Sequence, residues 1–339
     1  MKKEMNKKTI ALVATVVLVF GALTGCGSKN VNIASASDST KGNQAKTITI
    51  ADQANYYTAK VALKKGFLAE EFGDEYNFDV QIFANGPAIN EAMTAGRIEI
   101  AEYGDTPAIQ AFANDIDVKI ISTLWESDNA YALIAGAETG IESTGDLKGK
   151  RIGYQAGTTL HQFALKILEK EGLTPSDVTL VNISSTEGIA ALSKGEIDTV
   201  FTAPPFENAI EQTGGKLITT NKEYYVQPVF ILANGTFAKE NPEFVSRLLK
   251  VFDETNKWIV ENVDEATKIV SDFNGADEAT VRGYYDNRDW VIGWHNDLTE
   301  NLSDSIQFSY DNGNITSLFD ANDLVDTSYL ESAGLYKKE

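Results

Sequence analysis

The chain is poor in the side chains that carry out most enzyme chemistry. Its 339 residues include one cysteine and two histidines. A single cysteine cannot form an internal disulfide, and it cannot supply a cysteine cluster to a metal. The motifs HExxH, GxSxG and CxxC do not occur in the sequence, so these common signatures of a zinc protease, a serine hydrolase or a redox pair are missing. We therefore predict a protein that is not an enzyme and that needs no metal or cofactor.

Positive charge is also scarce. The chain has 29 lysines and arginines against 49 acidic residues, which gives a formal net charge of −20 at pH 7. This balance argues against binding to nucleic acid and against a basic face that would attract anionic lipid headgroups. It does not exclude a small anionic ligand, because the N-termini of helices supply local positive potential within a negative molecule.

The N-terminal segment has the pattern of an export signal. Lysines at positions 2, 3, 7 and 8 precede an apolar run, Ile10–Leu23, which is too short to span a membrane comfortably. The run ends in Leu23-Thr24-Gly25-Cys26, which resembles the lipobox of bacterial lipoprotein precursors. The alternative is a buried free thiol behind an uncleaved anchor, but the position, flanks and uniqueness of Cys26 favour the lipobox.

The lipobox implies a particular place for the protein. We expect residues 1–25 to be a lipoprotein signal peptide and Cys26 to carry acyl chains such as palmitate. Residues 26–46 are mostly small and polar, which is typical of a flexible tether. The protein would then be a monomer anchored to the cell membrane through lipid, on its extracytoplasmic face.

The remaining sequence alternates strand and helix patterns, which indicates an α/β fold. The expected strands are Thr47–Ala51, Phe78–Phe83, Ile98–Tyr103, Val118–Thr123, Ala130–Ala135, Arg151–Tyr154, Thr179–Asn182, Thr199–Ala203, Lys216–Thr220 and Pro228–Ala233. Helices dominate from Pro242 onward, where Asn241 is a good N-cap and proline suits the first helical position. Two further helices are expected over Asp264–Phe273 and from Asp277 to about Trp290.

This order of elements predicts two crossings between lobes. If the helical C-terminal section packs onto the first section, the chain crosses near Ser122–Asn129 and returns near Val226–Asn234. Two crossings form a hinge and leave a cleft between the lobes, which can close around a ligand.

Three stretches carry a resemblance to a known family. Phe83–Ile121, Asp146–Pro205 and Phe237–Asn262 resemble, in this order, the nitrate/sulfonate/taurine class of substrate-binding proteins of ABC transporters. The resemblance implies a type II periplasmic-binding-protein fold, in which two crossover strands join two Rossmann-like lobes around a ligand cleft. Lobe 1 would comprise residues 47–125 and 232–339, and lobe 2 residues 126–231.

The same resemblance implies capture of a small anionic organic solute and its delivery, unaltered, to an ABC permease. The segment Thr202–Pro205 departs from the Trp-Asp-Pro-like sequence common in taurine and sulfonate binders. An aromatic or heterocyclic solute, such as a pyrimidine or flavin precursor, is therefore an alternative. It would lie among Tyr56, Tyr57, Trp125, Tyr154 and Phe206. A thiamine-pyrimidine synthase-like enzyme is a remote alternative, and a surface-adhesion lipoprotein is another.

Candidate ligand contacts follow from the places where strands turn into helices. In open α/β sheets, ligands bind beyond the carboxyl ends of the strands, close to helix N-termini. This rule and the resemblance together point to Gln53, Tyr56, Gly104, Asp105, Thr106, Gly157, Thr158, Thr159, His161 and Pro205.

Several of these residues have an alternative structural role. Asp105 could cap its own helix, Thr158 and Thr159 could be N-caps, and His161 could face solvent. Glu187 belongs to a Ser-x-x-Glu capping box that begins at Ser184, so we expect it to be structural. Gly86 and Pro87 could be turn residues, and the tryptophans at 125, 290 and 294 could be core packing.

Overall fold

The computed structural model describes residues 45–286 and 288–336. The expected signal peptide, the lipid site at Cys26 and nearly all of the expected tether lie outside these residues. The first strand already includes Lys46, at the end of the range expected for the tether. In the described part of the chain, no helix is both long and apolar enough to cross a membrane.

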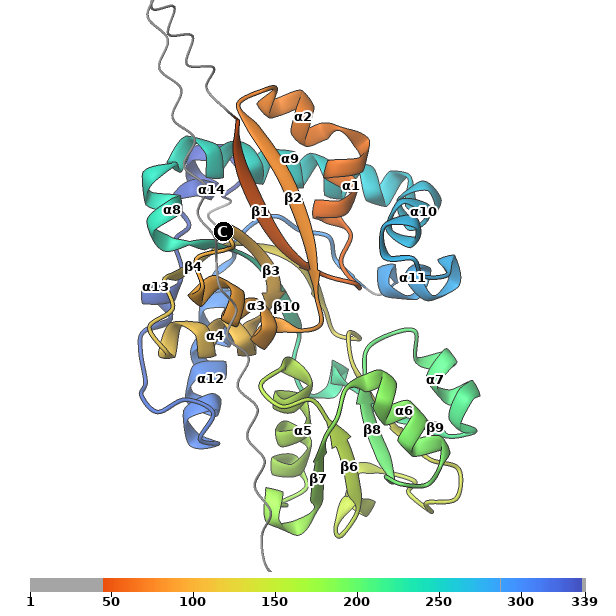
Figure 1. The fold of residues 1–339 in the computed structure, drawn as a ribbon. Helices are drawn as coiled ribbons and strands as arrows, with labels where there is room; N and C mark the ends of the chain where they lie inside the picture. The colour runs from red at the N-terminus through yellow and green to blue at the C-terminus, as the bar shows by residue number, and fades with distance from the viewer. Residues whose placement is uncertain (1–44, 287, 337–339) are drawn as a thin grey trace, which may run out of the picture. The chain divides into compact units, whose positions relative to one another are not determined.

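Ten strands of the described chain form two five-stranded sheets (Figure 1). Sheet 1 has the order β2-β1-β3-β10-β4. β1 pairs in parallel with β2 and β3, whereas β10 runs antiparallel between β3 and β4. Their bounds are β1 Lys46–Gln53, β2 Tyr76–Phe83, β3 Ile100–Gly104, β4 Val118–Ser127 and β10 Gln227–Asn234.

Sheet 2 repeats this arrangement with the order β7-β6-β8-β5-β9. β6 pairs in parallel with β7 and β8, and β5 runs antiparallel between β8 and β9. The bounds are β5 Ala132–Ala135, β6 Arg151–Tyr154, β7 Thr179–Asn182, β8 Thr199–Thr202 and β9 Lys216–Thr220. All ten strands expected from the sequence are present, with ends that differ by a few residues.

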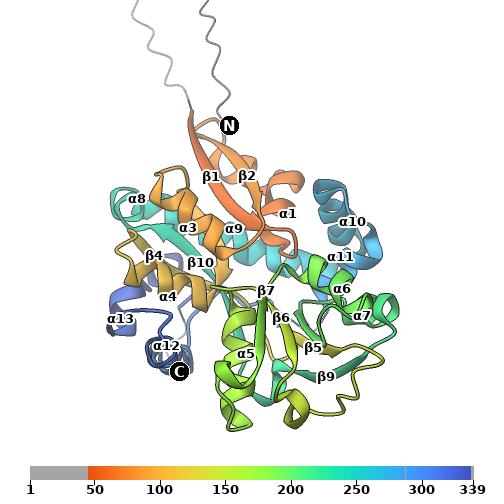
Figure 2. The same cartoon turned by 60° about the horizontal axis from the view of Figure 1, so that its bottom comes forward.

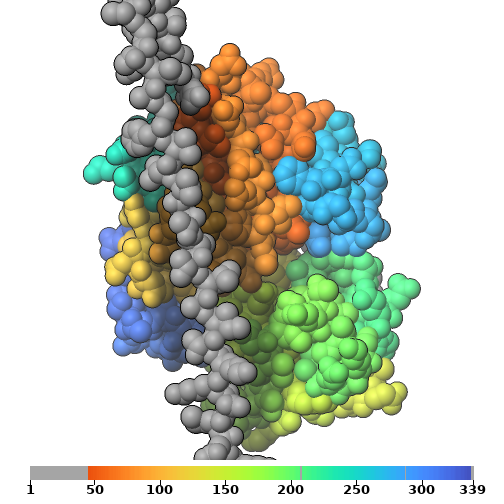
Figure 3. Space-filling model, in the orientation of Figure 1, coloured from red at the N-terminus to blue at the C-terminus, as the bar shows by residue number. Residues whose placement is uncertain are grey.

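The chain passes between the sheets twice. It runs from β4 into β5, and it returns from β9 into β10. Two crossings are therefore present as expected, but they lie at residues 128–131 and 221–226. Most residues of the ranges expected for them belong to β4 and β10. The lobe boundaries expected at 125/126 and 231/232 fall inside β4 and β10, which both belong to sheet 1. In Figure 3 the part built on sheet 2, largely green, lies below the orange part of sheet 1, with blue C-terminal segments above it on the right and beside it on the left.

Helices cover the faces of both sheets (Figures 1 and 2). Sheet 1 carries α1 Thr58–Lys65, α2 Phe67–Phe72, α3 Gly86–Thr94, α4 Asp105–Ala113, α8 Gly235–Glu240, α9 Pro242–Glu261, α10 Val263–Asn274, α11 Glu278–Tyr285, α12 Asn296–Asp311, α13 Ala321–Leu324 and α14 Ser328–Ala333. Sheet 2 carries α5 Thr159–Lys170, α6 Ser185–Ser193 and α7 Phe206–Thr213. Three short 3₁₀ turns, Thr144–Leu147, Pro175–Asp177 and Asn221–Glu223, connect elements of sheet 2 and the return crossing.

Burial explains why the strands could be read from sequence. Every residue of β3 and of β5 is buried, as expected for central strands covered on both faces. The stripe predicted after Pro242 is also present in α9, where Phe244, Leu248 and Phe252 are buried. This helix packs on α1 and α14.

Two local expectations were wrong. The helix expected to reach Trp290 ends at Tyr285, and Trp290 instead packs edge-on against Tyr57. Asn241 stands at the N-cap position of α9 but does not cap it through its side chain. Its amide donates to the carbonyl of Phe237 in the preceding helix, α8.

Candidate functional site

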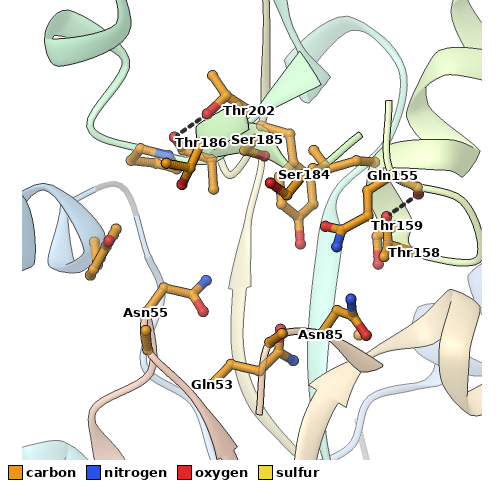
Figure 4. A pocket seen from close by; sticks show the side chains of 18 of the residues that line it. Gln53, Asn55, Asn85, Gln155, Thr158, Thr159, Ser184, Ser185, Thr186 and Thr202 are labelled. Carbon is orange, nitrogen blue, oxygen red and sulfur yellow. Dashed lines mark hydrogen bonds between the residues drawn. The ribbon is translucent and has the colours of Figure 1, made fainter. Parts of the chain in front are cut away.

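A cavity of about 620 Å³ lies between the carboxyl ends of the two sheets. Figure 4 shows polar side chains from both sides facing one another across it. The sheet 1 side contributes Gln53, Ala54, Asn55, Tyr56, Ile82, Phe83, Ala84, Asn85, Gly86, Gly104, Pro107, Thr280 and Tyr284. The crossing and the sheet 2 side contribute Tyr131, Gln155, Thr158, Thr159, Leu160, Ser184, Ser185, Thr186, Ile189, Thr202, Ala203, Pro204, Pro205, Asn208, Ala209 and Gln212.

The described side chains that line the cavity are all uncharged. They are amides, hydroxyls and apolar groups, and none is an aspartate, glutamate, lysine, arginine or histidine. In the described residues, no group of three or more histidine, cysteine, aspartate or glutamate side chains is placed to hold a metal. Any charge on a ligand would therefore have to interact with neutral donors and main-chain dipoles along this described lining.

The N-terminus of α5 opens on this cavity without a side-chain cap. Thr158 occupies the N-cap position, but its hydroxyl donates to the carbonyl of Gln155 at 2.7 Å instead of capping the helix. The first main-chain N–H groups of a helix have no acceptor within it and point out of its end. Because Thr158, Thr159 and Leu160 line the cavity, this end of α5 presents unused donors and positive potential to it.

Two other helices that begin at the cavity, α3 and α6, are capped by side chains. Asn85 accepts from the N–H of Ala88 at the start of α3. α4 has no side-chain cap at its N-cap residue Gly104, although Asp105, its first residue, accepts from the adjacent N–H of Thr106. The capping box predicted for Ser184 and Glu187 is present at the start of α6 and is confirmed. α7 follows Pro205 at its N-cap position and also has no side-chain cap.

On the sheet 1 side, Gln53 and Tyr56 form a linked pair at the end of β1. The amide nitrogen of Gln53 lies 3.1 Å from the Tyr56 hydroxyl oxygen and donates to it. The Tyr56 ring packs edge-on against Trp125, with ring centroids 5.8 Å apart. Gln53 and Tyr56 were both predicted from the sequence, and both line the cavity.

Tyr131 was not predicted, although it lines the cavity. It belongs to the crossing between the sheets, and Thr159, the first residue of α5, lines the same cavity. Burial raises the pKa of the Tyr131 hydroxyl to about 12, so it is a neutral donor at physiological pH. Its place in the segment 128–131 between the two sheets is the signal that could have found it.

Asp105 and Thr106 are not placed at the cavity. Both are buried, and they take part in a network between α4, α5 and α12. The Thr106 hydroxyl donates to the Gln162 side-chain oxygen at 2.6 Å, and the Ser305 hydroxyl donates to Asp105 at 3.2 Å. Burial raises the pKa of Asp105, while the Thr106 N–H and the Gln227 and Ser305 side chains oppose that rise.

Gly157 and His161 also lie beside the cavity lining rather than in it. Gly157 has a φ of +72°, as expected for a glycine there, and an added Cβ would lie 3.3 Å from both Gln110 and Pro87. The His161 ring packs against Tyr154 with centroids 4.8 Å apart. Burial lowers the pKa of His161.

The remaining predicted contacts do reach the cavity. Gly104, Thr158, Thr159 and Pro205 line it. A Cβ at Gly104 would come within 2.6 Å of the Thr159 hydroxyl, so the two sides of the site approach closely there. Of the five aromatic residues expected around a ring-shaped solute, Tyr56 lines the cavity, and Tyr131 and Tyr284 join it from positions that were not predicted.

Comparison with known proteins agrees with this architecture. Residues 52–266 match the family model described as NMT1/THI5 like. A putative aliphatic sulfonates-binding protein of Bacillus subtilis is 28% identical over 338 residues, which is 97% of each chain. The taurine-binding periplasmic protein of Escherichia coli is 28% identical over 225 residues, which cover 65% of this chain and 69% of that protein.

Solved structures share the fold. The alkanesulfonate-binding protein SsuA from Xanthomonas axonopodis pv. citri, bound to MOPS, superimposes with a TM-score of 0.75. It is 19% identical, and the match covers 84% of this chain and 99% of that one. The α/β fold with two five-stranded mixed sheets matches this type of periplasmic binding protein, as the sequence predicted. Since the family model spans more than half of the sequence, the chain belongs to the NMT1/THI5-like family.

Proposed function

We propose that this protein captures a small anionic organic solute of the sulfonate type in the cavity and passes it unaltered to an ABC importer. The observation that carries the proposal is the N-terminus of α5, which enters the cavity without a side-chain cap. A sulfonate has three oxygens that accept hydrogen bonds, and helix N-termini bind such anions well.

The other donors of the site suit the same ligand. Amide and hydroxyl groups from Gln53, Tyr56, Asn85 and Gln155 also line the cavity. They would satisfy sulfonate oxygens without a salt bridge. The names of the relatives support a role in binding and transport rather than catalysis.

We also propose the cellular setting suggested by the sequence. The parts built on sheets 1 and 2 would act as two lobes that close on the solute about the two crossings. Lipid on Cys26 would hold the monomer at the extracytoplasmic face of the membrane, next to the permease.

An aromatic solute is a second candidate. Tyr56, Tyr131 and Tyr284 all line the cavity, and tyrosine faces stack on flat rings. An aryl group that carries an anionic head would use both features of the site.

A substitution at the N-cap of α5 tests the main proposal. Aspartate at position 158 would cap the helix and place a negative charge where we expect the anion. We expect Thr158→Asp to weaken binding of MOPS by tenfold or more in calorimetry, while the isosteric neutral cap Thr158→Asn weakens it less. Equal affinities for both variants and the wild type would rule out this end of α5 as the anion site.

A further inference from the structure

Lys60 of α1 is completely buried behind the cavity wall. Neither its side chain nor that of Asp52 is exposed to solvent, and the Lys60 ammonium lies 2.8 Å from the Asp52 carboxylate. The ammonium also donates to the main-chain oxygens of Gln53 and Tyr56, at 2.7 and 2.8 Å. A lysine ammonium has three N–H donors, and these two carbonyls use two of them, while Asp52 is the ion-pair partner of the ammonium.

The segment between these contacts is the loop from Gln53 to Tyr56, and every carbonyl in it accepts from a donor in the surrounding protein. Lys60 takes those of Gln53 and Tyr56. Asn274 donates to the carbonyl of Ala54, and Arg288 donates to that of Asn55, both at 2.7 Å.

This arrangement matters because all four residues of the loop line the cavity. A carbonyl oxygen is the negative end of the peptide dipole, so an oxygen turned toward the cavity would repel an anion. Donors that bind these oxygens keep them from the solute. The loop can then offer the cavity the side chains of Gln53 and Tyr56.

The pair formed by those side chains has a defined donor direction. The Tyr56 oxygen accepts from the Gln53 amide at 3.1 Å. Its own O–H proton is therefore free to donate to a third group. A solute oxygen in the cavity would be such an acceptor.

We propose that Lys60 is a positioning residue for ligand specificity, which holds the Gln53–Tyr56 loop so that the Tyr56 hydroxyl donates to an oxygen of the bound anion. The identity of the ligand as an anion rests on the proposed function, whereas the ordering of the Gln53–Tyr56 loop by Lys60 does not. Lys60 acts only through the loop and does not touch the solute.

A variant that removes both buried charges tests this role. Asp52→Asn keeps the acceptor that binds the Gln53 N–H at 2.6 Å, and Lys60→Met keeps the length of the side chain. Since a methionine side chain has no N–H to donate to the two carbonyls, we expect the double variant to bind MOPS about tenfold more weakly, the effect of one lost hydrogen bond, with unchanged stoichiometry. One control should bind as the wild type does: Lys64→Met, which removes an exposed charge from the same helix.

A double-mutant cycle with Tyr56→Phe separates positioning from a general loss of structure. If Lys60 works through the Tyr56 hydroxyl, the double variant should lose no further affinity in a Tyr56→Phe background. Losses that add, or an unchanged dissociation constant, would overturn the proposal. If the double variant does not fold, the same cycle is run with Asp52→Asn and Lys60→Gln, which retains two N–H donors and should lose less affinity.

Amide hydrogen exchange in the solute-free protein distinguishes this proposal from the proposed function. If the wild type binds no MOPS, the proposed function fails for that solute. The positioning role is then decided by the exchange of amides 53–57. Faster exchange in the double variant than in Lys64→Met supports it, and equal exchange overturns it.

Discussion

The hydroxyl of Thr106 donates to the side-chain oxygen of Gln162 at 2.6 Å, and this contact joins two helices that follow strands of different sheets. The Gln162 amide continues to the Ser305 hydroxyl at 3.1 Å. The link therefore includes α12, which lies beside α5 in Figure 2. The Phe308 ring of α12 also lies beneath the Lys166 ammonium of α5. The link fixes the helix whose N-terminus enters the cavity.

We expect Gln162→Leu to lower the free energy of unfolding by about 1 to 3 kcal/mol, because it leaves the buried Thr106 and Ser305 hydroxyls without their partner. Urea denaturation of the solute-free protein measures this loss. Gln307→Leu is the matched control, because Gln307 is an exposed residue of α12. Equal stability of the two variants would show that the contact contributes nothing.

Glu102 gives a prediction about stability and pH. It is fully buried in β3, and burial together with the negative charge of Asp52 raises its pKa well above 4.5, while Lys60 opposes the rise. The folded state then binds the proton more tightly than the unfolded state. The contribution of Glu102 to the free energy of unfolding is fully present below pH 4.5. It is lost as the pH rises from there through the pKa of the folded state.

Glu102→Gln mimics the protonated acid, so it should remove this loss. We expect the variant to match the wild type near pH 4.5 and to have the higher free energy of unfolding at pH 8. Glu91→Gln, an exposed change on α3, is the control. A difference between Glu102→Gln and the wild type that stays constant with pH would contradict the assignment.

His161 should have little effect on anion binding. It packs on Tyr154 outside the cavity lining, and burial lowers its pKa below 6.5, so the folded state favours the neutral ring. Its contribution to stability is present above pH 6.5 and is lost as the pH falls through the lower folded value. NMR titration of the ring should give that lower value.

Calorimetry checks the other half of this prediction. The affinity for MOPS should change equally between pH 6 and 8 in the wild type and in His161→Phe. If the affinity of the wild type rises on acidification and that of the variant does not, then His161 contributes to ligand binding, and this prediction is wrong.

A substitution at Gly157 tests whether binding depends on the close contact between the sheet 1 and sheet 2 sides of the site. The φ of +72° at Gly157 strains any other residue, and a side chain there would also meet Gln110 and Pro87. Gly172 has a φ of +67° with no atom within 4 Å of an added Cβ, so Gly172→Val carries the strain alone. Both valine variants should lose stability by about 1 to 2 kcal/mol.

Only Gly157→Val should also weaken the binding of MOPS, because its side chain would keep α5 away from the sheet 1 side. Calorimetry of the two variants compares the affinities. Equal weakening in both would mean that strain, and not this contact, is responsible.

Much of the fold could be predicted because its signals are local. Apolar runs marked strands that are buried on both faces, and the capping box at Ser184 marked the start of α6. The helix expected to reach Trp290 was wrong because its end depends on tertiary contacts. Arg288 donates to the carbonyl of Asn55, and Trp290 packs on Tyr57, more than 200 residues earlier in the chain.

The site was predicted less completely for the same reason. Gln53, Tyr56, Thr158 and Thr159 follow strands, so the rule for α/β sheets found them. Tyr284 comes from the C-terminal helices, and no local pattern places it opposite sheet 2. Asp105 obeyed the local rule but lies in a buried network, because Ser305, 200 residues away, binds it.

We propose that the cavity recognises the negative charge of a solute through neutral donors at the N-terminus of α5. Calorimetric titration with ethanesulfonate and with ethyl methyl sulfone tests it most directly, because the two molecules have nearly the same shape and differ in charge. We expect ethanesulfonate to bind at one site per chain and the sulfone to bind at least tenfold more weakly. Equal affinities, or no binding of the sulfonate, would contradict the claim.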